Sequence, residues 1–404
     1  MLRFRLPRHQ LRRPAFALLA ATAFAVTTPV FAEDGWTTEW KNGTRIESAD
    51  GDIKLKIGGR IHLDFAHPDE DDAFAALDLK SESKIRRARL TISGTLYGKT
   101  EFKLDYDFTE GETTPKDVYV GLVDLPGVGG IRVGHFKEPF GLEESTSSNS
   151  IPFLERAMSN EAVNPVRNVG VMLHNSVLGD RMSWSLGAFQ DSDGFARTDD
   201  GEWSFTGRIT GAPLVGDDGG PVVHLGLAAS KRSPTDNRYR LRSRAQTSFG
   251  PRLIDTGSFD TDSVDLLGLE TALVQGPFWA AAEYMQADVG GVTNGTAQGF
   301  NVRAGWFLTG ESRPYKSSQG IFDRVKPKAI FGKDGGTGAW EIAVRYTDLD
   351  LNDGSLSGGT QDGFTVGVNW YVNSASRVML NYASADVEGA GTVDYAMFRF
   401  QVDF

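Results

Sequence analysis

The sequence predicts an all-β fold, a 16-stranded antiparallel transmembrane β-barrel over residues 51–404. Three observations predict it. Apolar and polar residues alternate with period 2, the alternating segments are even in number and long enough to cross a bilayer, and long and short connections take turns between them. The composition fits this class, because 40% hydrophobic residues are too many for a disordered chain and too few for a helical membrane bundle.

Residues 1–32 are expected to be an export signal. Five arginines and no acidic residue precede an apolar run over 15–30, and Val30-Phe31-Ala32 offers a small-residue cleavage site. A membrane-anchoring helix is the alternative, which the short run and Pro29 disfavour. Because those arginines are the only charged residues of the segment, its removal takes the formal net charge from −11 to −16. We therefore expect an exported, acidic protein without a nucleic-acid partner, in which residues 33–50 form a short periplasmic segment.

Strict alternation is clearest in the first segment after this leader. Ile57, Ile61 and Phe65 occupy odd positions, whereas Arg60 and His62 occupy even ones. In extended backbone this gives one oily and one charged face, while a helix would spread the same residues around its axis.

Sixteen segments carry this pattern. They are 53–65, 85–97, 100–109, 116–123, 131–136, 168–175, 181–190, 202–212, 221–231, 264–274, 277–287, 299–309, 339–348, 363–373, 376–385 and 394–404. Most approach the roughly 9 to 11 residues that a tilted strand needs to cross a bilayer, whereas strands of soluble sandwiches are nearer five or six.

The connections agree with a barrel whose termini both lie in the periplasm. Long connections are expected on the outer side, and short ones, such as 98–99 and 275–276, on the periplasmic side. The expected outer connections are 66–84, 109–115, 137–167 and 232–263. The connection 310–338 breaks the rule, since it is long where a periplasmic turn is due.

Several local strings resemble the phosphate-selective porin O and P family. They are Gly134-His135-Phe136-Lys137-Glu138-Pro139-Phe140-Gly141-Leu142-Glu143, Phe153-Leu154-Glu155-Arg156, Trp306-Phe307-Leu308-Thr309-Gly310-Glu311, Gly338-Ala339-Trp340-Glu341 and Asn369-Trp370-Tyr371. The resemblance covers about residues 51–404. It implies a 16-stranded outer-membrane barrel, usually a homotrimer, whose connections fold inward and narrow a water-filled, anion-preferring pore.

The connection 137–167 is the best candidate for narrowing the pore. A barrel of this size leaves an aqueous lumen, and Phe140, Leu142 and Phe153 give this connection apolar residues to pack against the wall. Lys137, together with Arg156 and Arg167, would then face the solute. The alternative is a surface loop that covers the mouth.

Candidate anion-binding residues lie in the string 237–244. Arg238, Arg240, Arg242 and Arg244 recur every ~6.6 Å on one side of extended backbone, which makes a row roughly 20 Å long. Guanidinium groups bind oxyanions bidentately, and basic rows select anions in pores. The family resemblance implies a similar arginine ladder. A solvated loop that binds lipopolysaccharide phosphates is the alternative. Further lumen-facing candidates are Arg87, Arg89, Arg303 and Arg345.

Catalytic residues, metal ligands and cofactors are not expected. Asp255-Thr256-Gly257-Ser258 matches an aspartic-protease string, but the second copy which that chemistry requires is missing. Asp191, Asp193 and Glu202 fall at calcium-loop positions without the intervening ligand and glycine. The five histidines after the leader show no ligand-spaced pair on one element.

These observations predict a passive anion channel of the bacterial outer membrane, with inorganic phosphate or other small anions as solutes. Outer-membrane lipid or lipopolysaccharide and two further copies of the chain are the expected partners. A poorly selective pore for other small solutes is the alternative within this class. A barrel enzyme or an adhesin is the alternative outside it.

Overall fold

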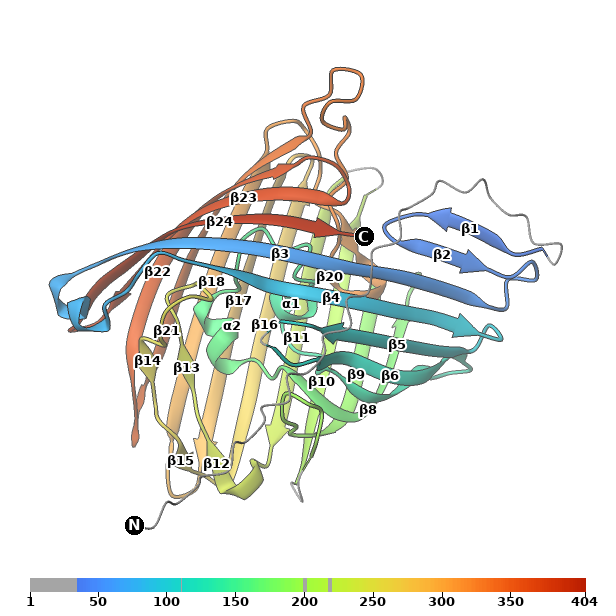
Figure 1. Ribbon diagram of the computed structural model, residues 1–404. Coiled ribbons are helices and arrows are strands. Elements are labelled where there is room, and N and C mark those ends of the chain that lie inside the picture. Colours follow the sequence, from blue (N-terminus) through green and yellow to red (C-terminus); the bar gives the residue numbers. More distant parts are fainter. Residues whose placement is uncertain (1–34, 110, 199–201, 217–219) are drawn as a thin grey trace, which may run out of the picture.

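A computed structural model describes residues 35–109, 111–198, 202–216 and 220–404 (Figure 1). Sixteen strands make up the barrel wall. They are β3 (Lys54–Glu70), β4 (Glu82–Leu96), β5 (Thr100–Asp107), β6 (Thr114–Leu125), β7 (Gly129–Lys137), β8 (Arg167–Val177), β9 (Met182–Gln190), β10 (Trp203–Val215), β11 (Val222–Arg232), β16 (Ser263–Gln275), β17 (Phe278–Gly290), β18 (Gly295–Phe307), β21 (Ala339–Asp353), β22 (Leu356–Tyr371), β23 (Ser376–Val387) and β24 (Gly391–Asp403).

Pairing between the first and last of these strands closes the barrel. Each wall strand pairs antiparallel with its neighbours in the chain, and β24 pairs with β3 from Val393↔Glu70 to Asp403↔Arg60. Closure leaves no free edge between wall strands, which is the condition for sheet structure in a bilayer. The predicted 16-stranded antiparallel barrel is confirmed.

Several strands extend beyond their predicted ends at the end of the barrel opposite the N-terminal hairpin. β3 continues to Glu70, and β21 and β22 form a hairpin that pairs as far as Asp353↔Leu356. The sequence pattern missed these extensions because the pattern inverts there: Leu349 and Leu351 of β21 are buried inside the barrel, whereas Asn352 is exposed, so the apolar outer face that marks a wall strand ends.

The wall is apolar outside and polar inside. Along β3, Ile61 and Phe65 are 45% and 49% exposed, while His62 and Asp64 between them are buried at 0% and 1%. Outward aromatic rings pack in pairs, with Phe278 on Trp306 and Trp340 on Trp370 nearly parallel at 5.6 and 5.4 Å between centroids. This inside-out distribution is the one a lipid-facing barrel requires. No helix among the described residues is long and apolar enough to cross a membrane.

A hairpin precedes the wall. β1 (Thr37–Trp40) pairs with β2 (Thr44–Glu47), and β2 pairs with β3 from Thr44↔Ile57 to Glu47↔Lys54, next to the place where β24 ends. In Figure 1 it projects beyond the end of the barrel, beside the chain's C-terminus. The expected 33–50 segment therefore contains a β-hairpin; the predicted signal, residues 1–32, lies outside the described residues.

Three connections fold into the barrel. From one end, 138–166 carries α1 (Leu142–Ser145) and α2 (Met158–Val163), which lie within the barrel in Figure 1. The connection 233–262, also from this end, carries η2 (Thr235–Asn237), β12 (Arg238–Tyr239), β13 (Arg242–Ser243), β14 (Ile254–Asp255) and β15 (Phe259–Asp260). From the opposite end, 308–338 carries β19 (Tyr315–Lys316), η3 (Ser317–Gln319) and β20 (Ile321–Phe322). A further short helix, η1 (Asp72–Leu77), lies between β3 and β4.

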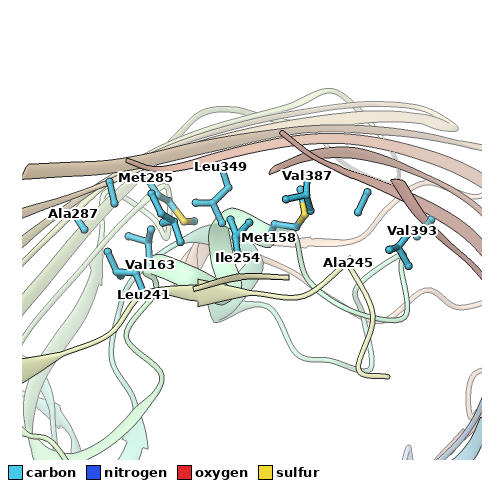
Figure 2. Close-up of a cluster of buried hydrophobic side chains, with 14 of the residues drawn as sticks. Met158, Val163, Leu241, Ala245, Ile254, Met285, Ala287, Leu349, Val387 and Val393 are labelled. Carbon is cyan, nitrogen blue, oxygen red and sulfur yellow. The ribbon is translucent and has the colours of Figure 1, made fainter. Parts of the chain in front are cut away.

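A hydrophobic core inside the lumen holds two of these connections. Figure 2 shows Met158 and Val163 of α2 beside Leu241 and Ile254 of the second connection, against Leu349 and other residues of the wall. Phe140 also joins this core, and a Cβ on Gly268 would meet its ring at 3.0 Å, so the glycine leaves room for the phenylalanine. The inward position of 137–167 is thereby confirmed over the surface-loop alternative.

Candidate anion-binding site

The inward connection 138–166 is fixed to the wall by buried charged groups. The backbone N–H of Glu143 donates to the Glu283 carboxylate at 3.1 and 3.2 Å, and Arg303 holds the same carboxylate at 2.6 Å. Gly141, at φ +73°, makes the turn into α1 that brings this N–H to the wall. Arg399 of β24 donates to the carbonyl of Leu154 at 2.8 Å. Such charge-assisted bonds at Glu143 and at Leu154 set the position of the connection across the lumen.

A cavity of about 190 Å³ lies where this connection faces the wall strands β3 to β8. Its lining combines seven cationic side chains, two carboxylates and three serines, and Ile321 of β20 lines it from the opposite connection. The cationic side chains are Arg60, Arg87, Arg89, Lys103, Lys137, Arg156 and Arg167. The others are Asp105, Asp117, Ser145, Ser147 and Ser148. We call this cavity the constriction.

Part of this charge is neutralised within the chain. Asp117 bridges Lys103 at 2.6 Å and Arg167 at 2.7 Å, and Glu144 binds Lys137 at 3.0 Å and Arg156 at 2.9 Å. Asp117 and Glu144 are thus each shared by two cations. The constriction consequently keeps an excess of positive charge while its side chains remain positioned by ion pairs.

Among the seven cations that line the constriction, Arg60 alone has no ion-pair partner in the described chain. Its guanidinium donates to Ser148 Oγ at 2.9 Å, and its Nε is buried without a hydrogen-bond acceptor among the described residues. Arg87, 4% exposed, approaches the Glu155 carboxylate only to 3.5 Å. Because Arg60 lines the cavity without a carboxylate partner in the described chain, a bound anion would supply its counter-charge.

The acidic groups of the connection 138–166 are held ionised. Burial raises the pKa of Glu155, but Arg86, Arg87 and Arg399 outweigh it and bring this pKa well below its usual range. Burial likewise raises the pKa of Glu144, and Arg156 and Lys137 lower it further than burial raises it. Both carboxylates therefore act as fixed counter-charges at neutral pH.

The predicted arginine row lies on one side of the second inward connection. The side chains between the arginines, such as Leu241 and Ser243, are buried at 0%, whereas Arg238 and Arg240 are exposed. The row is not a set of free cations, however. Arg240 binds Asp255 at 2.7 Å, Arg244 binds Glu161 at 2.8 Å and Arg238 lies 3.6 Å from Asp260. Within the described chain, Arg242 has no ion-pair partner.

The nine sequence-predicted residues occupy three environments. Lys137, Arg87 and Arg89 line the constriction, and Arg238, Arg240, Arg242 and Arg244 follow the second connection. Arg303 and Arg345 face the interior as expected but are 2% exposed each, because the connection 138–166 covers them. Arg345 donates to the Glu155 carbonyl at 2.9 Å and to Gln246 Oε1 at 3.0 Å. The expectation that these two line the path is corrected, since they anchor the connections instead.

A second basic cavity lies toward the opposite end of the barrel. Its volume is about 940 Å³, it shares Ser147 with the constriction, and its lining includes seven cations and two carboxylates. We call it the lysine vestibule. The cations are Lys41, Arg45, Lys56, Lys316, Arg324, Lys326 and Lys328. They come from the N-terminal hairpin, β3 and the connection 308–338, so the long connection that broke the loop rule supplies more than half of them.

Sequence reasoning left Arg60, Lys103 and the lysine vestibule out of the candidate site. Arg60 and Lys103 lie on the polar face of predicted strands. The alternation predicts that their side chains face the lumen, but it does not predict which of the lumen-facing residues line the site. The vestibule joins segments more than 250 positions apart in the chain, which strand periodicity cannot bring together.

The protease-like and calcium-loop-like strings of the sequence have structural roles here. Asp255 of the protease-like string binds Arg240, and Asp193 of the calcium-like string binds Arg197 at 2.8 Å. Among the described residues, no group of three or more metal-ligating side chains is close enough to hold a metal ion.

Comparison with known proteins agrees with this geometry. The family model of the phosphate-selective porin O and P matches residues 55–404. The chain belongs to the phosphate-selective porin O and P family. It is therefore an outer-membrane porin, an anion-selective channel across the bacterial outer membrane.

Individual relatives cover most of the chain. An uncharacterized protein of Caulobacter vibrioides is 31% identical over 392 residues, which are 90% of this chain and 76% of that protein. Porin O of Pseudomonas aeruginosa is 28% identical over 432 residues, 94% of each chain.

Solved structures share the fold of this porin at low identity. An anion-selective porin from Comamonas acidovorans superposes with a TM-score of 0.53 and 13% identity, covering 87% of this chain and 100% of that one. OmpT, an outer membrane protein of Vibrio cholerae, superposes with a TM-score of 0.56 and 9% identity, covering 87% and 98%.

Proposed function

We propose that this porin conducts phosphate or a related oxyanion, and that the constriction binds the anion during passage. One observation carries the proposal: seven cationic side chains and three serines line a cavity of about 190 Å³ with only two carboxylates. Planar guanidinium groups match the oxygens of an oxyanion, and serine hydroxyls donate further hydrogen bonds.

The remaining charges suggest a route through the channel. The arginine row of 233–262 would attract anions at the outer side, the constriction would bind them, and the lysine vestibule would draw them toward the periplasm. Rows of fixed charge raise the local concentration of a counter-ion in a narrow, low-dielectric passage. Conduction also requires that no single site bind too tightly, which a succession of sites achieves.

The alternative of a poorly selective pore is disfavoured by the partial desolvation of the cations. Arg87 is 4% exposed, and Arg60 lines the cavity without an ion-pair partner in the described chain, so these guanidinium groups favour a solute that offers negatively charged oxygen atoms. Catalysis is not part of the proposal; we expect passive diffusion with no chemical step.

We further propose that three copies of this porin associate through the part of the wall that has the shortest strands. β5, β7 and β9 have 8, 9 and 9 residues, whereas β21 and β22 have 15 and 16. A strand of eight residues tilted by about 45° rises only ~19 Å, less than the roughly 25 Å apolar band of such barrels. The side with short strands therefore suits contact with a partner copy, and the side with long strands suits contact with lipid and lipopolysaccharide.

We also propose that residues 1–32 are an export signal and that the hairpin that follows them lies in the periplasm.

Block of chloride current tests the oxyanion site. Purified porin in planar bilayers at pH 7 should carry a chloride current that added phosphate reduces. Arg60→Gln removes a positive charge and its fork, so the phosphate concentration for half block should rise about tenfold or more. Arg181→Gln, in an exposed turn between β8 and β9, is the matched control and should leave that concentration unchanged.

Two results would contradict the proposal. A wild-type pore that carries chloride without phosphate block would make this a general anion channel. Equal phosphate block in Arg60→Gln and wild type would remove the binding site from the constriction.

A further inference from the structure

One carboxylate of the constriction is not part of an ion pair. Asp105 of β5 is 1% exposed and accepts one hydrogen bond, from Thr91 Oγ1 to Oδ1 at 3.0 Å. Thr91 lies directly opposite it on β4. Its Oδ2 accepts no hydrogen bond from any described residue and yet is not enclosed by protein, so it faces the cavity.

The neighbouring carboxylates differ from Asp105 in this respect. Asp117 is held by Lys103 and Arg167, and Asp107, two positions along β5, is held by Arg89 at 2.8 Å. Asp105 interacts electrostatically with Arg60, Arg89 and Arg167, but none of them comes within the 4.0 Å of an ion pair. A single acceptor oxygen thus points into a cavity otherwise built for anions.

An unpaired carboxylate repels an anion unless that anion carries a proton. An ionised carboxylate only accepts hydrogen bonds. Hydrogen phosphate and dihydrogen phosphate each have a P–OH group that donates one, while sulfate at neutral pH has none and would set its lone pairs against those of Oδ2. The same discrimination applies to any protonated oxyanion against a fully deprotonated one.

We propose that Asp105 is a specificity-determining residue that accepts a hydrogen bond from the P–OH group and makes the pore prefer phosphate to sulfate. The proposal rests on oxyanion binding at the constriction, and adds which oxyanions the site accepts. The arginines supply the attraction for both anions, and Asp105 supplies the difference between them. When the wrong solute binds, such a site leaves a buried polar group without its hydrogen bond. A site of this kind therefore discriminates between similar solutes more strongly than an apolar pocket does.

Competition between the two anions tests this role. The concentrations of phosphate and of sulfate that halve the chloride current are measured in planar bilayers at pH 7 for wild type and Asp105→Asn. In the wild type, sulfate should need about tenfold more than phosphate or a larger excess. Asparagine keeps the size and the Thr91 bond but can donate, so sulfate block should strengthen, phosphate block should weaken, and the ratio should approach one.

Asp107→Asn is the matched control. It removes the same charge from the same strand, but from a carboxylate that is already paired with Arg89. It should strengthen block by both anions and leave their ratio as in the wild type. Heat-modifiable migration on gels verifies folding of each variant, and Asp105→Ser, with a smaller polar side chain, replaces Asp105→Asn if the latter does not fold.

The outcomes separate this inference from the function beneath it. An unchanged ratio in the Asp105 variants, with both anions still blocking, would overturn the role of Asp105 alone. A shift of the ratio in Asp107→Asn as large as in Asp105→Asn would overturn it too, because any lost charge would then suffice. Absence of block by either anion in wild type would refute the oxyanion site itself, and the role of Asp105 with it.

Discussion

Arg399 and Asp64 face each other across the seam where β24 meets β3, and the guanidinium donates to both carboxylate oxygens at 2.6 Å. The same guanidinium donates to the Leu154 carbonyl of the inward connection at 2.8 Å. One buried side chain thus joins the closure of the barrel to the segment that narrows its lumen. The position of the constriction therefore depends on barrel closure.

Replacement of Arg399 by methionine should destabilise the barrel by about 3–5 kcal/mol, because Asp64, 1% exposed, would keep a buried charge without its partner. The double variant Arg399→Met with Asp64→Leu should regain much of this loss. Urea unfolding in detergent micelles, followed by tryptophan fluorescence, measures the change. Arg197→Met, which breaks an exposed pair with Asp193, is the control and should unfold like wild type. A wild-type midpoint for Arg399→Met would contradict the importance of the seam pair.

Glu155→Gln should weaken the anchoring of the inward connection with a defined pH dependence. The pKa of Glu155 in the folded porin lies well below its usual value, so its ionised form contributes stability above the unfolded-state pKa of about 4.3. This contribution is lost as the pH falls from there through the folded-state pKa. The difference in unfolding free energy between wild type and Glu155→Gln should be equal at pH 7 and pH 5 and smaller at pH 3. A difference that disappears between pH 7 and pH 5 would contradict this assignment.

The wall could be predicted from the sequence because lipid imposes a local rule. Every second side chain must be apolar wherever a strand crosses the bilayer, so Ile61 and Phe65 reveal the strand without knowledge of its neighbours. Outside the bilayer the rule ends, which is why the upper parts of β21 and β22 were missed.

The site was predictable only in part because it depends on contacts distant in sequence. Periodicity indicates that Arg303, Arg345 and Arg87 all point inward. It does not show that the connection 138–166 covers Arg303 and Arg345 but leaves Arg87 beside the cavity. Likewise, Arg240 and Arg242 are equivalent positions of the arginine row. The pairing of β13 with β14, which the sequence pattern does not show, brings Asp255 close to the row, and Asp255 forms its ion pair with Arg240. The ion pairs decide which cations remain available to a solute.

Charge reversal in the lysine vestibule should reduce anion selectivity. Lys316 and Lys326 line the vestibule and have no ion-pair partner within the described chain, so Lys316→Glu with Lys326→Glu changes the local charge by four. Reversal potentials across a potassium chloride gradient should shift toward the cation side. Lys333→Glu, outside the vestibule, should leave them unchanged. Equal selectivity of the double variant and wild type would exclude the vestibule from the conducting path.

Cysteine labelling tests the orientation of the barrel. The chain has no cysteine, so a single introduced thiol is unambiguous. Asp193→Cys, in the connection after β9, should react with an impermeant maleimide on intact cells, and Asp124→Cys, at the opposite end of the wall, should react only after lysis. The reverse pattern would invert the barrel in the membrane.

The arginine row provides the sharpest test of how this porin attracts anions, because two adjacent members differ in pairing. Arg240 is neutralised by Asp255, with Nε to Oδ1 at 2.7 Å, whereas Arg242 has no ion-pair partner in the described chain. Arg242→Ala should therefore lower anion selectivity more than Arg240→Ala, although both remove one charge.

Reversal potentials for these two variants should be measured across salt gradients in dilute and in concentrated salt. The Debye length is ~10 Å at 0.1 M and ~3 Å at 1 M, so the effect of Arg242→Ala should be large in dilute salt and small in concentrated salt. Arg242→Lys keeps the charge and should keep the gross selectivity, but it should lose affinity for an oxyanion that uses the planar fork. Both variants should remain folded, because charges in an aqueous lumen contribute little to stability. If both alanine variants kept wild-type selectivity in dilute salt, the row would lie outside the conducting path, and selection would rest with the constriction and the lysine vestibule.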